Sequence, residues 1–245
     1  MKNLTITFLF CLLLTGAYAQ TVKDVDGNTY KTVKIGNQVW MAENLRTTHL
    51  NDGTPITLAQ SNKEWKSIKK MPAYCWYEND SDNQIIYGNL YNWYVVETEK
   101  ICPVGWHVPT SVEDIDGLFK YFNENANNYD GSKEGDKFAK AMAAKKYWIN
   151  PNDADQGSPG TDGFDEYQNK SGFSALPGGH RHKNGDYCSL GEIAVWWTSQ
   201  KKWGFSISNI KNNTGFRINK PEYGASIRCV KDNAVDYSDP LDDTN

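Results

Sequence analysis

Several kinds of sequence feature are missing from this chain of 245 residues, and each absence excludes a class of protein. No G-x-S-x-G, H-E-x-x-H, phosphate-loop or G-x-G-x-x-G motif occurs, so the common signatures of hydrolases, zinc peptidases and nucleotide-binding enzymes are absent. None of the five cysteines forms a C-x-x-C pair, which argues against a cysteine-ligated zinc site. The net charge of −4 lacks the basic excess of a nucleic-acid-binding protein.

Long hydrophobic runs are also missing, except for one at the N-terminus. Lys2 is followed by an apolar run over residues 4–14 and by the small-x-small site Ala17-Tyr18-Ala19. This pattern predicts a signal peptide over residues 1–19, cleaved near Ala19. The run is shorter than the ~20 residues that a membrane helix needs, so we expect no membrane span. The protein is therefore expected to be secreted or to lie at the cell surface or in the envelope.

The remaining chain is predicted to form one domain with a short tail. Residues 20–232 carry alternating hydrophobic patterns and turn residues throughout, whereas residues 233–245 are acidic and contain no base. Such a composition is typical of a disordered tail. Export permits disulfides among the four cysteines beyond the signal peptide, and their spacing leaves all three pairings open. These four are Cys75, Cys102, Cys188 and Cys229.

The stretch CPVGWHVPTSVED, residues 102–114, concentrates chemically active residue types. Thr110 and Glu113 form the T-x-x-E pattern of a helix capping box, and apolar residues then recur on one helical face as far as Phe122. Acids in the first turn suit the helix dipole. His107 is expected at a polar position of the preceding strand. The stretch therefore predicts a strand that runs into a helix, rather than a metal or catalytic site.

Other segments predict further elements. Residues 30–41 read as a hairpin, the surroundings of Trp65 and residues 87–96 as short helices, and residues 134–148 as a second main helix. The part of the chain beyond Phe173 contains short alternating runs separated by glycine or asparagine turns, which predict strands. These runs are FSALPGGH, DYCSLG, AVWWTSQ, WGFSISNI, TGFRINK and ASIRCVKD.

Two acidic segments raise the question of calcium. DVDGNTY, residues 24–30, has the 1-3-5 spacing of a calcium loop but lacks its later glycine and glutamate, so a tight turn is the better interpretation. The long polar loop at 150–172 has no regular ligand spacing, although long loops are often functional. Its acids that bear on a calcium site are Asp153, Asp155, Asp162 and Asp165. We expect no cofactor, with calcium at this loop as the one alternative.

Seven stretches occur in an order that resembles one known family. They are KDVDGNTYKTVKIGNQVWMAENL, YCWYEND, YGNLYNWYVV, CPVGWHVPTSVED, SGFSALPGGHR, WWTSQ and ASIRCVKD. Over residues 22–232 the chain resembles the Fibrobacter succinogenes major paralogous domain, a family of exported bacterial proteins. That family in turn is similar to the C-type-lectin-like fold, in the branch shared with sulfatase-modifying domains. The resemblance implies an α+β fold with two main helices, short and mostly antiparallel strands, and long loops.

The resemblance also carries implications for the cysteines and for activity. It implies that Cys102 pairs with Cys229, which leaves Cys75 to pair with Cys188. Two positions depart from the family pattern, which usually has Trp where this chain has Asp114 and Tyr where it has His180. Formylglycine-generating enzymes need two reactive cysteines near the C-terminus, and here Cys229 stands alone, so their oxidase chemistry is not expected.

Export, abundant aromatic residues and the lectin-like resemblance together predict a non-catalytic binding module for a glycan or cell-surface polymer. Either Trp196 or Trp197 is expected to face outward from its strand and stack on a sugar, unless both are buried between layers. The predicted ligand-binding residues are Arg181, His182, Tyr187, Trp196 and Trp197. The alternatives are a structural envelope protein that binds other proteins and, more remotely, a glycan-active enzyme. His180 and His182 lack an identified third metal ligand, and no pair of carboxylates stands out for glycosidase chemistry.

Overall fold

An antiparallel sheet brings the two ends of the domain together. The computed structural model describes residues 20–201, 203–216 and 220–233, so the predicted signal peptide and the predicted tail beyond Asn233 lie outside the described residues. The sheet has the order β1-β2-β3-β13-β7, and all its strand pairs are antiparallel. Its strands are β1 (Thr21–Lys23), β2 (Thr29–Ile35), β3 (Gln38–Met41), β13 (Val230–Lys231) and β7 (Trp106–His107). The β2–β3 hairpin confirms the one predicted at residues 30–41.

Three smaller sheets complete the strand content. β10 (Ile193–Trp197), β11 (Gly204–Ser208) and β12 (Thr214–Phe216) form an antiparallel sheet, and β8 (Gly178–Arg181) pairs with β9 (Tyr187–Leu190). The third sheet contains a parallel pair, β4 with β5, and an antiparallel pair, β5 with β6. Its strands are β4 (Thr57–Leu58), β5 (Ala73–Cys75) and β6 (Leu90–Tyr91). The fold is therefore mixed, with many short strands, as the sequence predicts.

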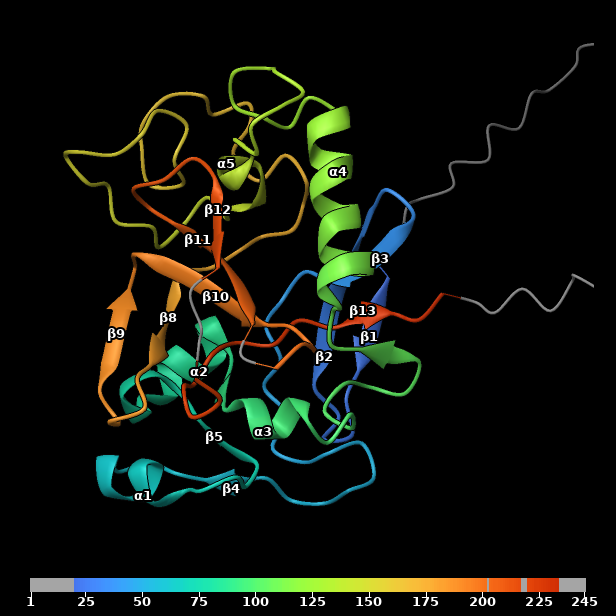
Figure 1. The fold of residues 1–245 in the computed structure, drawn as a ribbon, viewed down its shortest axis with the longest axis vertical. Coiled ribbons are helices and arrows are strands. Elements are labelled where there is room, and N and C mark those ends of the chain that lie inside the picture. Colours follow the sequence, from blue (N-terminus) through green and yellow to red (C-terminus); the bar gives the residue numbers. More distant parts are fainter. Residues whose placement is uncertain (1–19, 202, 217–219, 234–245) are drawn as a thin grey trace, which may run out of the picture.

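One long helical segment stands beside the five-stranded sheet (Figure 1). It begins with a π-helical turn, η2 (Ser111–Ile115), and continues as α4 (Asp116–Glu124). Thr110 caps it, since its hydroxyl accepts hydrogen bonds from the backbone N–H groups of Glu113 and Asp114. This confirms the helix start predicted at Thr110. The other helical elements are α1 (Asn62–Ser67), η1 (Tyr77–Asn79), α2 (Ser81–Tyr87), α3 (Trp93–Val96) and α5 (Ala139–Met142).

The second main helix predicted over residues 134–148 is wrong. Only α5, Ala139–Met142, is helical there. Ala143 turns to an extended conformation and forms a parallel bridge with Ala175. The segment thus buries its apolar residues in an irregular, partly strand-like path. The helix predicted over residues 87–96 is likewise replaced by the end of α2, then β6 and α3.

Two large hydrophobic clusters and a smaller one form the core. The first lies under the N-terminal hairpin and α3, and the second packs α4 and α5 against β10 and β11. The smaller third cluster joins α1, β5 and η1. Strand β10 separates the two large clusters, because Val195 and Trp197 belong to the first and Ala194 and Trp196 to the second. Among the residues described, no helix has the length and hydrophobicity to cross a membrane.

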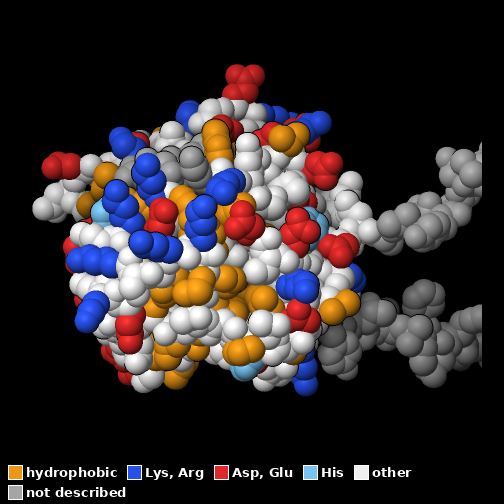
Figure 2. Space-filling model, turned by 60° about the horizontal axis from the view of Figure 1, so that its bottom comes forward, with side chains coloured by type: hydrophobic (Ala, Val, Ile, Leu, Met, Phe, Trp, Pro, Cys, Tyr) orange, Lys and Arg blue, Asp and Glu red, His pale blue; other side chains and the backbone are white. Residues whose placement is uncertain are grey.

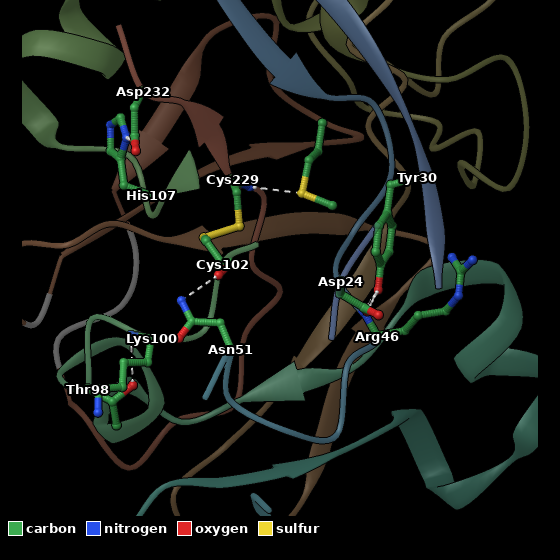
Figure 3. The surroundings of a disulfide bond; sticks show 11 residues. Asp24, Tyr30, Arg46, Asn51, Thr98, Lys100, Cys102, His107, Cys229 and Asp232 are labelled. Atoms are coloured by element: carbon green, nitrogen blue, oxygen red, sulfur yellow. Dashed lines mark hydrogen bonds and ion pairs between the residues drawn. A yellow bond between two sulfur atoms is a disulfide. The ribbon is translucent and has the colours of Figure 1, made fainter. Parts of the chain in front are cut away.

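A disulfide between Cys102 and Cys229 joins the segment before β7 to the segment before β13 (Figure 3). This confirms the bridge implied by the family resemblance. The second predicted bridge is wrong, because Cys75 and Cys188 are free. Tyr187 on β9 faces Cys75. Successive strand residues point to opposite sides, so Cys188 points away from Cys75.

Candidate ligand-binding surface

The structure does not form a surface from the five predicted ligand-binding residues. Arg181, Trp196 and Trp197 are each 0 % exposed, whereas His182 and Tyr187 are half-buried. The alternative in which both tryptophans are buried between layers therefore holds. The expectation of an outward-facing tryptophan at 196 or 197 is wrong, because hydrophobic clusters cover both faces of β10.

Both tryptophans are fixed by polar and aromatic contacts inside the core. The indole N–H of Trp196 donates to Asn44 Oδ1 at 2.9 Å, and its ring stacks on Phe205 with centroids 4.8 Å apart. The indole N–H of Trp197 donates to the backbone oxygen of Tyr91 at 2.7 Å. Buried indole groups with satisfied N–H donors are typical of core residues. They therefore act as core residues that stabilise the fold.

Three adjoining hollows lie elsewhere on the surface. The first, of ≈ 610 Å³, is lined by Asp26, Asn28, Glu43, Arg46, Thr48, Gln84 and Ile85. The second, of ≈ 220 Å³, shares Glu43, Arg46 and Ile85 with it and continues to Ala144. The third, of ≈ 470 Å³, shares Ala144 with the second and is lined further by Lys145, Trp148, Asn150, Asp162, Asp165 and Gln168, among others. The shared residues arrange the hollows in a row, with the second hollow in the middle, and we call this row the three-hollow groove.

Two charged side chains where the first two hollows meet, those of Arg46 and Glu43, are positioned by contacts with strand β2. The guanidinium of Arg46 lies 4.7 Å from the centre of the Tyr30 ring. The Tyr30 hydroxyl accepts from the Arg46 backbone N–H at 3.0 Å and donates to Asp24 (Figure 3). Glu43 accepts a 2.6 Å hydrogen bond from the backbone N–H of Lys31. Both charged groups remain part-exposed, so they are positioned before any ligand arrives.

The floor of the middle hollow includes the buried amide of Asn44. Its oxygen accepts from Trp196 and from the Arg228 Nε at 2.8 Å, while its nitrogen donates to the Tyr87 backbone oxygen at 2.8 Å. Arg228 is 0 % exposed, and this burial lowers its pKa to about 9. Fully satisfied buried networks of this kind are rigid. The middle hollow therefore has a fixed base.

Aromatic and polar groups line the third hollow. Trp148 is half-buried and donates its indole N–H to the Ala175 backbone oxygen at 3.3 Å. The amide of Asn150 donates to Asp162 at 3.2 Å, and the amide of Gln168 donates to the backbone oxygens at 143 and 144. An aromatic ring beside carboxylate and amide groups offers an apolar contact surface together with hydrogen-bond partners for hydroxyl groups.

Lys140 holds the loop that forms one wall of the third hollow. Its side chain is 1 % exposed, and its ammonium donates to the backbone oxygens of Thr161 at 2.6 Å and Ser158 at 3.4 Å. Burial lowers the pKa of Lys140, while the charges of Asp165 and Asp162 oppose that shift. The ammonium group of Lys140 is thus the cation around which the loop is folded.

Several acids of the segments considered for calcium have protein partners. In the first, Asp26 accepts from the Thr48 backbone N–H at 2.5 Å and lies 2.6 Å from His49 Nδ1. Burial opposes ionisation of Asp26, but these bonds outweigh it and hold its pKa below the usual value. In the long loop, Asp155 pairs with Lys211 at 3.4 Å. Across the part of the chain that the structure describes, no three His, Cys, Asp or Glu side chains group as metal ligands do.

Sequence reasoning missed the groove because its residues come from distant segments. The first hollow combines residues near 26, 46 and 85, and no local pattern brings them together. One signal did point to the third hollow, namely the length and polarity of the loop at 150–172. Trp148, two residues before this loop, is a second signal that the sequence reasoning did not use.

A comparison with protein-family models gives one finding. The model of the Fibrobacter succinogenes major domain matches residues 33–231. Comparisons with curated proteins and with solved structures give no match.

Proposed function

The chain belongs to the Fibrobacter succinogenes major domain family, and on that premise we propose that it is an exported, non-catalytic module that binds a neutral polysaccharide along the three-hollow groove. One observation carries this proposal: the hollows share lining residues and follow one another in a row. A row of adjoining sites suits consecutive units of a linear polymer better than a single compact ligand.

The chemistry of the groove supports an uncharged, hydroxyl-rich ligand. Charges of both signs line the groove: Arg46 and Lys145 are positive, and Glu43 and Asp162 are negative. Sugar hydroxyls donate and accept, so they can pair with both kinds of group. Ile85, which is 74 % exposed, and Trp148 add apolar contact surface at the first two and the third hollow respectively.

Export and the lectin-like fold are parts of the same proposal. The Cys102–Cys229 bridge supports export, because structural disulfides persist in oxidising compartments. The return of β13 beside the N-terminal hairpin supports the lectin-like fold, since terminal strands lie together in that fold. Binding is proposed to need no calcium, because Lys140 already supplies a cation to the loop of the third hollow.

The test is a glycan-array screen of the purified protein with and without calcium, followed by calorimetric titration with oligosaccharides of increasing length from the best hit. We expect affinity to rise with length until the row of hollows is filled. Trp148→Ala should weaken binding by about fivefold or more, since loss of an aromatic stacking contact costs ~1–3 kcal/mol. The matched control is Trp203→Ala, because Trp203 is 45 % exposed and lines none of the three hollows.

Two outcomes would contradict the proposal. A blank array under both conditions would favour the structural alternative, in which the protein binds other envelope proteins. Binding that Trp148→Ala and Trp203→Ala weaken equally would place the ligand outside the groove.

A further inference from the structure

A second surface, separate from the groove, is strongly basic although the protein is acidic overall. It is formed by the segment from α1 to Lys70, the β8–β9 hairpin and the turn at 220–224, and we call it the basic face. Figure 2 shows the molecule from below, where Lys and Arg side chains gather beside a hydrophobic band and a histidine. Six lysines belong to the basic face, and all are exposed: Lys63, Lys66, Lys69, Lys70, Lys183 and Lys220.

Direct contacts join the three segments of the basic face. Asn62 on α1 donates to Asp186 in the hairpin at 3.3 Å. Trp65 on α1 donates its indole N–H to the backbone oxygen of Glu222 at 3.0 Å. The hairpin and the turn exchange two backbone hydrogen bonds of 2.8 Å between Arg181 and Gly224. The lysines are therefore carried by one continuous, fixed patch.

The positive charge of the basic face is only partly compensated. No ion pair involves any of the six lysines within the described ranges, whereas five lysines elsewhere pair with a carboxylate. The face also carries three acids, which keep their charge because their hydrogen-bond partners are neutral, so six lysines against three carboxylates leave an excess of three positive charges. Glu64 accepts the N–H groups of the α1 capping box, Asp186 accepts from Asn184, and Glu222 is hydrogen-bonded to Tyr94.

A buried arginine adds to this charge from below. Arg181 is 0 % exposed and donates to the backbone oxygens of Ala59 at 2.6 Å, Gln60 at 2.9 Å and Gly185 at 2.9 Å. Its guanidinium lies between the rings of Trp65 and Tyr187 at 4.7 and 4.6 Å. Backbone oxygens satisfy its donors but do not cancel its charge, which the Glu64 carboxylate partly offsets. Since salt screens buried charges little, Arg181 reinforces the potential over the face.

Aromatic rings lie among these charges. Tyr223 in the turn stacks with His180 at 6.0 Å between centroids and meets His182 edge-on at 4.7 Å. All three rings are half-buried, so their outer edges and faces reach the surface. A part-exposed tyrosine surrounded by cations is suited to a sugar ring that carries acidic substituents.

We propose that the basic face binds an acidic polysaccharide, with the lysines pairing to its carboxylates and Tyr223 packing against a sugar ring. This site is independent of the three-hollow groove and differs from it in ligand charge. Arg181, which the sequence points to as a ligand contact, acts here as a positioning and electrostatic residue beneath the surface.

The test is affinity electrophoresis of the full protein in gels that contain polygalacturonate, over a series of salt concentrations. We expect retardation that weakens as salt rises, because exposed ion pairs are screened. The triple variant Lys63→Gln, Lys183→Gln and Lys220→Gln should bind about tenfold more weakly, since each exposed pair contributes a few-fold. Its matched control is Lys23→Gln, Lys133→Gln and Lys231→Gln, which removes the same charge from other exposed positions.

A second comparison tests the aromatic part of the proposal. Tyr223→Ala should weaken binding to polygalacturonate, whereas Tyr223→Phe, which keeps the ring, should bind as the wild type does. Gels that contain a neutral glucan show whether the groove binds sugars, so failure of one site is distinguishable from failure of the other.

Three results would overturn the proposal. The first is no retardation by polygalacturonate. The second is an equal loss in the two triple-lysine variants, which would mean that net charge alone governs binding. The third is binding of duplex DNA or of anionic phospholipid vesicles as tight as that of polygalacturonate, which would make the face a general anion patch.

Discussion

His107 lies between two carboxylates that come from different parts of the chain. Its Nε2 is 3.1 Å from Asp114, which follows the helix cap, and its Nδ1 is 2.6 Å from Asp232, which follows β13. The hydrogen bond to Asp114 raises the pKa of His107 to about 9, against the opposing effect of burial and with a further contribution from Asp232. The charged imidazole therefore ties the end of the described chain to the start of the main helix.

This arrangement predicts a loss of stability at alkaline pH. Because the pKa of His107 in the folded protein lies above the ordinary histidine value of 6.5, the stabilisation is fully present below about pH 6.5 and is lost as the pH rises through about 9. The side chain is 38 % exposed and solvent screens its ion pairs, so we expect a loss of only about 1 kcal/mol. Urea unfolding at pH 6 and pH 10 should show this loss in the wild type relative to His107→Gln. Identical pH dependence in the two proteins would contradict it.

Individual residue types predicted some roles correctly and others not. Thr110 and Cys102 have the roles that their local patterns or the family resemblance indicate. Trp196 and Trp197 do not, because strand alternation predicts one outward residue only where one face of the sheet meets solvent. The sequence carries no local sign that both faces of β10 are covered.

At the level of elements, the start of the main helix is capped in a way that differs from the predicted capping box. Asp114, not Glu113, reaches back: it accepts from the Thr110 backbone N–H at 2.7 Å and from the Thr110 hydroxyl at 2.8 Å. The first turn is π-helical, and this widened turn shifts the reciprocal acid by one position.

The shifted cap gives a direct prediction. Asp114→Ala should lower the free energy of unfolding by about 1–2 kcal/mol, the usual effect of losing a cap hydrogen bond. Glu113→Ala removes an exposed carboxylate from the position that the sequence pattern favours, and it should change stability by less than about 0.5 kcal/mol. Urea titrations monitored by tryptophan fluorescence would compare the two. A larger loss of unfolding free energy in Glu113→Ala than in Asp114→Ala would contradict this prediction and favour the capping box predicted from the sequence.

The loop at 150–172 depends on hydrogen bonds from the buried side chain of Lys140. Lys140→Gln should leave the backbone oxygens of Ser158 and Thr161 without their charged donor and destabilise the protein by about 1–3 kcal/mol. Hydrogen exchange should rise mainly in this loop. Lys145→Gln is the control, because Lys145 is exposed and, among the described residues, no hydrogen bond joins its side chain to the loop wall. Uniform exchange across the protein after Lys140→Gln would show that the effect is global.

Hydrophobic periodicity explains why one helix was predicted correctly and another was not. The apolar residues from Ile115 to Phe122 lie on one side of a helix, and no strand pairing interrupts this segment. Phe138, Ala141 and Met142 have a similar spacing, but a bridge between Ala143 and Ala175 ends the helix after four residues. Pairing with a segment over thirty residues away is not visible in a local window.

For the whole molecule, the order of the motifs predicted the family and the mixed fold of short strands and helices, whereas the two proposed binding surfaces could not be predicted. The three-hollow groove and the basic face are each built from segments far apart in the chain, which only the fold brings together. Arg181 is an example. Arginine is a residue type that often contacts ligands, but the Arg181 side chain is fully buried, so we propose that it supports the basic face from below.

The disulfide is the strongest single constraint on the whole fold, because it joins residues separated by 127 positions. In the chain-entropy view, closing so long a loop limits the unfolded chain and contributes up to about 5 kcal/mol. The double variant Cys102→Ala and Cys229→Ala should therefore lose about 2–5 kcal/mol of unfolding free energy. Reductant should produce a similar loss in the wild type and no further loss in the variant.

Thiol titration of the denatured protein, without the first 19 residues and without reductant, tests the cysteine assignment itself. The structure predicts two reactive thiols, those of Cys75 and Cys188, and four after reduction. Burial raises the pKa of Cys75 to about 11, so in the folded protein it should react more slowly than the half-buried Cys188. A count of zero before reduction would mean that the second bridge forms after all, which would require β9 to turn Cys188 toward Cys75 and Tyr187 away from it.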